Sequence, residues 1–226
     1  MTATIEFLGE SALLIQLGER IEGEINAQAI ALAEALRSAR LPGVLDVAPA
    51  YASVCVHYAP AQAGVRERLL AALPASLETS APARLPTKAL VEIPVCYGDE
   101  FGPDLDDVAQ RAQLGLREVV ARHTAAEYRV AMLGFAPGFP YLLGLAGALH
   151  TPRRASPRTR VPAGSIAIGG AQTGIYPREL PGGWNLIGRT PLQLFDVGRD
   201  PPALLAPGMR VRFRAIDAHE FAALSR

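Results

Sequence analysis

The sequence predicts two domains, an α+β domain with two layers and the element order ββαββα, followed by a mainly β domain built as a barrel or sandwich. Strand-like and helix-like hydrophobic patterns succeed each other over the first 80 residues. A stretch rich in Ala, Pro, Ser and Thr follows them. After Arg129 the apolar segments become short and are cut by Gly and Pro, which is typical of β domains. We therefore place the first domain at 1–80, a linker at 81–90 and the second domain at 91–226.

Hydrophobic spacing defines the elements of the first domain. Apolar side chains between Ile25 and Leu36 recur at helical spacing, and Pro42-Gly43 ends that helix. Segment 53–58 alternates apolar and polar residues, as a strand with one buried face does. This element order places two helices on one side of an antiparallel sheet. The expected strands and helices, in the order ββαββα, are 4–8, 12–17, 23–40, 44–47, 53–58 and 63–73.

The second domain is predicted to open with a strand, 91–96, and two helices. Asp104 is expected to be the N-cap of the first helix, and Gly115 separates it from the second helix, which spans 116–124. A short helix over 217–224 ends the chain. The strands expected between these helices are 130–135, 161–168, 184–187, 192–197 and 209–214.

Composition excludes several classes of protein. The 22 basic residues balance 22 acidic ones, which argues against a dedicated nucleic-acid binder. Apolar runs stay well short of the ~18 residues of a membrane span, and 1–18 lacks the basic start of a secretory signal. Cys55 and Cys96 lie far apart in apolar runs, which indicates buried, reduced thiols. We expect a cytoplasmic protein that binds neither nucleic acid nor membrane, and no metal site, because the histidines lack ligand spacing.

The segment between Gly134 and Pro191 is crowded with glycine, proline and arginine. Glycine allows close approach of backbones and proline fixes their shape, so the segment suits a rigid cradle. Arginine suits carboxylate or phosphate. The single acid of the segment is Glu179. Its six arginines are Arg153, Arg154, Arg158, Arg160, Arg178 and Arg189.

Two of these arginines are expected to project together. In an extended chain Arg158 and Arg160 point to the same face, and their charges repel unless an anion lies between them. Four arginines within eight residues favour an anion site. The alternative is that these side chains are solvated or paired with acids such as Asp99, Glu100 or Asp196.

Aromatic and amide-binding side chains flank the arginines. Phe135, Phe139 and Tyr141 lie on a stiff turn with two prolines, and form either one wall of a ligand cleft or a plug at the barrel end. Trp184, the only tryptophan, is either a further wall or a core aromatic. Hydrogen-bonding groups that suit an amide or ureido ligand follow a Gly-Gly turn, at Gln172, Thr173 and Tyr176.

Three motifs resemble the family formed by the B subunits of 5-oxoprolinase, also labelled allophanate hydrolase subunit 1. They are GFAPGFPYL at 134–142, TPRRASPRTRVPAGSIAIGGAQTGIYP at 151–177 and PGGWNLIGRTPLQLFD at 181–196. The resemblance implies a small α/β domain followed by a cyclophilin-like β-barrel. It also implies a non-autonomous subunit that works with companion C and A subunits and, with ATP, opens 5-oxoproline to L-glutamate.

Other functions stay open at this point. The same family includes KipI-type inhibitors of a sporulation histidine kinase, and related barrels occur in urea- and allophanate-metabolising enzymes. A prolyl isomerase is suggested by fold analogy alone. For the enzyme subunit we assign no catalytic residue, and we expect ATP to be shared with the companions. Substrate or anion binding is expected at Arg153, Arg154, Arg158, Arg160, Gln172, Thr173, Tyr176 and Arg189, and pocket walls at Phe135, Phe139, Tyr141 and Trp184.

Overall fold

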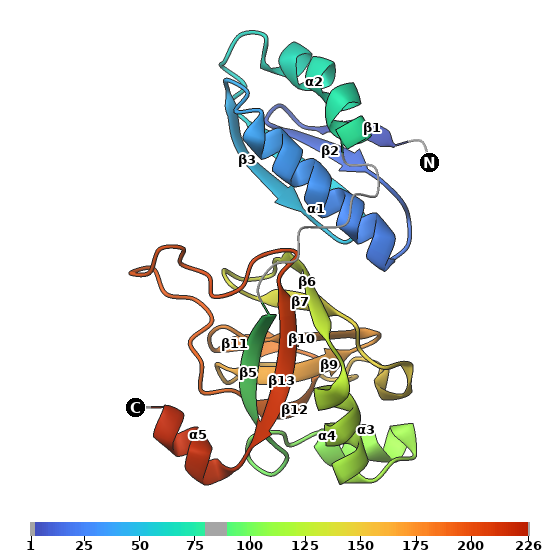
Figure 1. Cartoon of the computed structure of the whole chain (residues 1–226), viewed down its shortest axis with the longest axis vertical. Coiled ribbons are helices and arrows are strands. Elements are labelled where there is room, and N and C mark those ends of the chain that lie inside the picture. The colour runs from blue at the N-terminus through green and yellow to red at the C-terminus, as the bar shows by residue number, and fades with distance from the viewer. Residues whose placement is uncertain (1–2, 80–89, 226) are drawn as a thin grey trace. The chain divides into compact units, whose positions relative to one another are not determined.

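The computed structural model of the chain describes residues 3–79 and 90–225 (Figure 1). It divides into two compact units, Met1–Thr87 and Lys88–Arg226. The predicted linker, 81–90, lies outside the described residues except for Leu90. Among the helices of the described ranges, none is both long and apolar enough to cross a bilayer.

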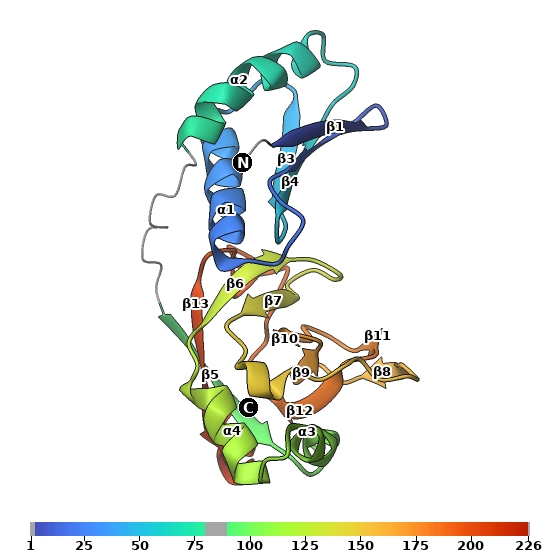
Figure 2. The same cartoon turned by 90° about the vertical axis from the view of Figure 1, so that its right-hand side faces the viewer.

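The first unit is a four-stranded antiparallel sheet with two helices on one side (Figure 2). The strand order in the sheet is β1-β2-β4-β3. This arrangement confirms the predicted ββαββα layout. Its elements are β1 (Thr4–Leu8), β2 (Ala12–Gln16), α1 (Gly23–Ser38), β3 (Val44–Pro49), β4 (Ser53–Tyr58) and α2 (Val65–Thr79).

The core of the first unit lies between the sheet and its helices. Leu13 and Ile15 of β2 stand opposite Val56 and Val54 of β4, and all four side chains are fully buried. Helix α2 continues to Thr79, six residues beyond its predicted end.

The second unit contains a closed barrel with the strand order β10-β7-β6-β13-β5-β12-β9, which confirms the predicted mainly β class. Strand β13 runs parallel to β5, the other barrel pairings are antiparallel, and β8 and β11 form a separate two-stranded ribbon. The strands are β5 (Leu90–Tyr97), β6 (Tyr128–Leu133), β7 (Pro140–Leu143), β8 (Arg158–Val161), β9 (Ser165–Gly169), β10 (Gln172–Ile175), β11 (Leu180–Gly182), β12 (Asn185–Arg189) and β13 (Arg210–Ile216). The helices are α3 (Leu105–Ala112), α4 (Leu116–Ala125), the 3₁₀ turn η1 (Gly147–Leu149) and α5 (Ala218–Leu224).

Two predicted strands were wrong. Segment 161–168 is divided at Pro162, which lacks an N–H, and Gly164, whose φ is +79°. The chain turns there, so that β8 pairs with β11 while β9 joins the barrel. Segment 192–197 forms only an isolated bridge between Phe195 and Ala203. The short strands β7, β10 and β11 were not predicted, because Gly and Pro interrupt their hydrophobic pattern.

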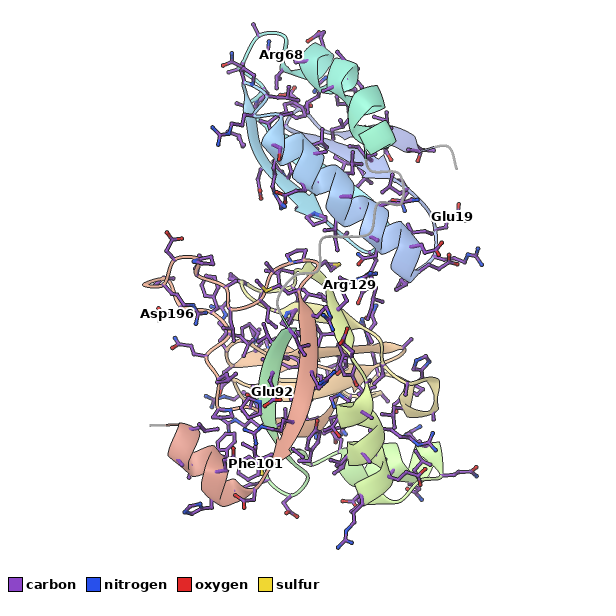
Figure 3. All side chains as sticks on the ribbon, viewed as in Figure 1. Glu19, Arg68, Glu92, Phe101, Arg129 and Asp196 are labelled. Atoms are coloured by element: carbon purple, nitrogen blue, oxygen red, sulfur yellow. The ribbon has the colours of Figure 1, made fainter. Side chains whose placement is uncertain are left out.

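The barrel interior is filled by side chains that alternate along the strands. Ile166 and Ile168 of β9 point into the main core, whereas Ala167 belongs to a second buried cluster on the opposite face of the strand. Outside the barrel lies Phe101, which is labelled in Figure 3. Its ring packs on that of Phe221 of α5, with 4.8 Å between the ring centroids.

Both cysteines are free thiols. Cys96 is buried as expected, but Cys55 is only half-buried. The strand β4 that carries Cys55 alternates its side chains between the helix-covered face of the sheet and the other face, and Cys55 belongs to the latter.

Candidate ligand-binding site

A cluster of aromatic rings lies on the outer face of the barrel. The ring of Phe139 contacts those of Tyr141, Tyr176 and Trp184, with centroid distances of 4.9, 5.2 and 5.8 Å. Phe135 meets Phe139 edge-to-face at 5.4 Å. These tilted and edge-to-face geometries are the ones that aromatic pairs prefer. The aromatic turn, strand β7 and the residues just after β10 and just before β12 thus supply one continuous wall.

Two glycines allow these rings to lie directly on the sheet. A Cβ atom on Gly169 would come within 2.6 Å of the Trp184 ring, and one on Gly174 within 2.9 Å of the Phe139 ring. Both distances are too short for a Cβ contact, so any side chain at either position would clash with the ring. The glycines of β9 and β10 therefore serve close approach of aromatic rings to the backbone.

The rings line an open cavity of about 210 Å³. Seven of the twelve predicted site residues line it, namely Phe135, Phe139, Tyr141, Arg153, Arg154, Tyr176 and Trp184. Pro157 and the segment Pro181–Gly183 complete the lining and were not predicted. The motif PGGW carried that signal, because its glycines allow the backbone to form part of the wall.

Asp104 organises the arginines next to this cavity. Its carboxylate, only 2% exposed, accepts hydrogen bonds from Arg154 Nη1 at 2.5 Å and from both terminal nitrogens of Arg158 at 2.8 Å. The N–H of Leu186 donates to it as well, at 2.7 Å. Asp104 does occupy the N-cap position of α3, but its side chain makes no capping bond. The carboxylate binds arginine instead, a role that we did not predict.

Arg158 and Arg160 therefore do not hold an anion between them. Arg158 is bound to Asp104, whereas Arg160 is 78% exposed and pairs with Glu179 at 2.8 Å. Arg189 donates its Nε hydrogen to the carbonyl of Ala163. None of these three arginines lines the cavity.

Arg153 and Arg154 are the arginines that line the cavity. The guanidinium of Arg153 lies over the Trp184 ring, 5.8 Å from its centroid, and the side chain is exposed. The Nε of Arg154 is buried and has no hydrogen-bond partner among the described residues. Such an orphaned donor is costly unless an acceptor reaches it.

Gln172 and Thr173 also lie away from the cavity. Alternation along β10 turns Gly174 outward beneath Phe139 and Thr173 into the barrel. There Thr173 Oγ1 donates to the carbonyl of Ala167 at 2.9 Å and accepts from Nε2 of His123 at 3.4 Å. Thr173 is thus part of the buried interior.

His123 is the centre of this buried polar chain. Because Thr173 Oγ1 donates its own proton to Ala167, Nε2 of His123 carries the proton of that contact, and Nδ1 then accepts a hydrogen bond from the Tyr97 hydroxyl at 2.8 Å. Burial lowers the pKa of His123 to about 3, so the imidazole is neutral. Within the described residues, no group of three or more His, Cys, Asp or Glu side chains is placed to hold a metal ion.

The two tyrosines of the cavity keep their protons. Burial raises the pKa of Tyr176, and the nearby Tyr141 hydroxyl raises it further. Burial likewise raises the pKa of Tyr141. Both side chains therefore present a neutral hydroxyl, which can donate a hydrogen bond to a carbonyl oxygen.

Comparison with known proteins shows two likenesses in sequence. A family model described as carboxyltransferase domain, subdomain C and D, matches residues 3–205. The B subunit of 5-oxoprolinase from Bacillus subtilis (strain 168) is 42% identical over 233 residues, which cover 96% of this chain and 94% of that protein. This match confirms the resemblance drawn from the motifs.

Solved structures show the same fold. The crystal structure of TTHA0988 is 43% identical, with a TM-score of 0.81. The likeness covers 92% of this chain but only 40% of TTHA0988. The urea amidolyase of K. lactis has a TM-score of 0.75 at 20% identity, over 98% of this chain and 15% of the amidolyase, and shows the fold alone.

Proposed function

Because the chain belongs to the family of carboxyltransferase domains, subdomains C and D, we propose that it is one subunit of an ATP-dependent 5-oxoprolinase. With companion subunits it would convert 5-oxoproline to L-glutamate. The observation that carries this proposal is the 42% identity to a 5-oxoprolinase B subunit along 96% of the chain.

The cavity suits a substrate of this size and chemistry. Its volume of about 210 Å³ is below the ~300–1,000 Å³ of typical ligand pockets, which favours a small molecule such as a five-membered lactam. Arg153 is exposed at the rim and can bind the substrate carboxylate. The Tyr176 hydroxyl can donate a hydrogen bond to the lactam carbonyl, and the aromatic rings of the wall can cover the flat amide.

The nucleotide is placed elsewhere in this proposal. A nucleoside triphosphate is larger than the cavity, so ATP would be held mainly by the companion subunits. In such an enzyme ATP supplies the phosphoryl group that makes an unreactive lactam carbonyl electrophilic. The contribution of this chain is to bind and orient the substrate, and Arg153 offsets negative charge near it.

The companion C and A subunits are the proposed partners. The region that matches this chain makes up 40% of TTHA0988, so in that protein it is joined to further domains. This supports the proposal that the present chain also works beside other domains. Among the described residues that line the cavity, the titratable side chains are two neutral tyrosines and two arginines, and none of these is a general base. The groups that move protons would then come from the partners.

The test is reconstitution. The chain is co-expressed with its companion subunits, and ATP hydrolysis and glutamate formation are measured with 5-oxoproline, urea or allophanate as substrate. We expect ATP hydrolysis that depends on 5-oxoproline and on the presence of this chain, with glutamate as product. Turnover of urea or allophanate in place of 5-oxoproline would contradict the proposal, as would full activity without the chain.

A further inference from the structure

Phe135 combines a strained backbone with an exposed ring. Its φ is +66°, a region that bulky side chains rarely adopt, and the residue is 61% exposed. The N–H of Ala136 donates to the carbonyl of Gly134 at 2.7 Å. A hydrogen bond that spans two residues around a positive φ closes a γ-turn of the rare, strained kind.

The surrounding structure keeps this turn in place. Gly134 N–H donates to Phe139 O at 3.2 Å, and Phe139 N–H donates to Ala136 O at 3.0 Å. Gly138 packs so tightly on Phe195 that a Cβ atom there would lie 2.7 Å from the Phe195 side chain. The loop is therefore fixed at both ends, which is the condition under which backbone strain persists.

The consequence of the turn is the position of the phenyl ring. It reaches the cavity and meets Phe139 and Tyr176 edge-to-face, at 5.4 and 6.4 Å between centroids. A phenylalanine with a purely structural role stabilises the fold by burying its ring. The ring of Phe135 instead remains mostly exposed to solvent, although its position requires a strained φ. Strain and exposure at one residue of a cavity wall point to contact with a ligand.

We propose that Phe135 is a specificity-determining residue that covers the flat amide face of the bound substrate, a small carboxylate with a planar amide. This inference rests on the proposed function and extends it. The ring adds contact area for the amide plane while Arg153 binds the carboxylate. Ligand and aromatic wall would together bury the phenyl surface that is now exposed.

Kinetics of the reconstituted complex test the role of the ring. Phe135→Leu keeps an apolar side chain but removes the flat face, and we expect the KM for 5-oxoproline to rise about tenfold with kcat nearly unchanged. Phe135→Tyr and Phe135→Trp restore a ring and should return KM to within about threefold of the wild-type value. Leu116→Ala, an exposed apolar side chain of α4 outside the cavity, is the matched control and should change neither constant.

Thermal unfolding of the chain tests the strain. Phe135→Gly and Phe135→Ala both remove the ring, but only glycine adopts a positive φ without penalty. We expect the glycine variant to unfold at the higher temperature although both variants share the raised KM. A lower unfolding temperature for the glycine variant would mean that the turn is unstrained and would overturn the inference.

The outcomes separate this inference from the function on which it rests. If the wild-type complex turns over 5-oxoproline and Phe135→Leu keeps its KM, the ring does not contact the substrate and only this inference fails. If the wild-type complex shows no response to 5-oxoproline, the proposed function fails and this inference falls with it.

Discussion

Arg158 binds Asp104 with both of its terminal nitrogens, each 2.8 Å from a different carboxylate oxygen. Such a bidentate pair is geometrically specific. Arg154 shares the same carboxylate and also lines the cavity, and its backbone N–H donates to Gly183 O, in another part of the wall. The buried ion cluster therefore connects the start of α3 to the ligand-binding face of the barrel.

Removal of the Asp104 charge should loosen this connection. In Asp104→Asn, two partly buried arginines lose their counter-ion, and we expect the unfolding free energy of the barrel unit to fall by about 3 kcal/mol. Denaturant unfolding followed by Trp184 fluorescence measures it, because Trp184 is the only tryptophan. Asp106→Asn, at an exposed position of the same helix, should cost less than about 1 kcal/mol. If both variants lost the same unfolding free energy, the ion cluster would contribute no more to stability than an exposed charge does.

Arg153 and Arg160 should differ in their effect on substrate binding. Arg153 lines the cavity, whereas Arg160 is exposed and paired with Glu179. A hydrogen bond to a charged group contributes about 1.5–3 kcal/mol, so Arg153→Gln should raise the KM for 5-oxoproline by roughly 10- to 100-fold. Arg160→Gln should leave it within about twofold, since an exposed ion pair contributes little. Steady-state kinetics of the reconstituted complex decide the matter, and the reverse order would reassign the anion site to Arg160.

His123 should make the barrel less stable in mild acid. Its folded pKa of about 3 lies below the ordinary value of 6.5, so the unfolded chain binds the proton more readily. The stability contributed by the neutral imidazole is complete above pH 6.5 and is lost progressively as the pH falls toward 3. Between about pH 7 and 5 this group alone should cost about 2 kcal/mol. In His123→Asn that part of the pH dependence should disappear, and an unchanged slope of unfolding free energy against pH would show that His123 is not kept neutral by the fold.

A methyl group beneath Trp184 should displace its ring. In Gly169→Ala the new Cβ would lie 2.6 Å from the indole, so the ring must move outward at a cost of about 1–3 kcal/mol. We expect a red-shifted Trp184 emission and a loss of substrate affinity. Gly147→Ala adds a methyl group where no atom lies within 4 Å and should change neither property. An unshifted emission spectrum in Gly169→Ala would mean that the indole does not lie on β9.

Local pattern predicted the elements of the first unit well. The pattern of a strand or helix involves residues only two to four positions apart, and the backbone geometry alone decides which of these share a face. Such patterns predicted the strand at 53–58 and the helix that contains Ile25 and Leu36. The same approach failed at 161–168, where a turn at Pro162 and Gly164 separates two short strands with different partners. Strand partners lie far along the chain, so local alternation cannot assign them.

The candidate site divides in the same way. The sequence alone predicted the aromatic turn and Arg153 as parts of the site, because aromatic residues, prolines and glycines are concentrated in one segment. Which arginines remain available for a ligand was decided by tertiary structure, since Asp104 lies 50 and 54 residues before Arg154 and Arg158. A carboxylate neutralises whichever guanidinium the fold brings within hydrogen-bond distance, and that distance is set by how β12, α3 and the arginine segment pack rather than by their spacing along the chain.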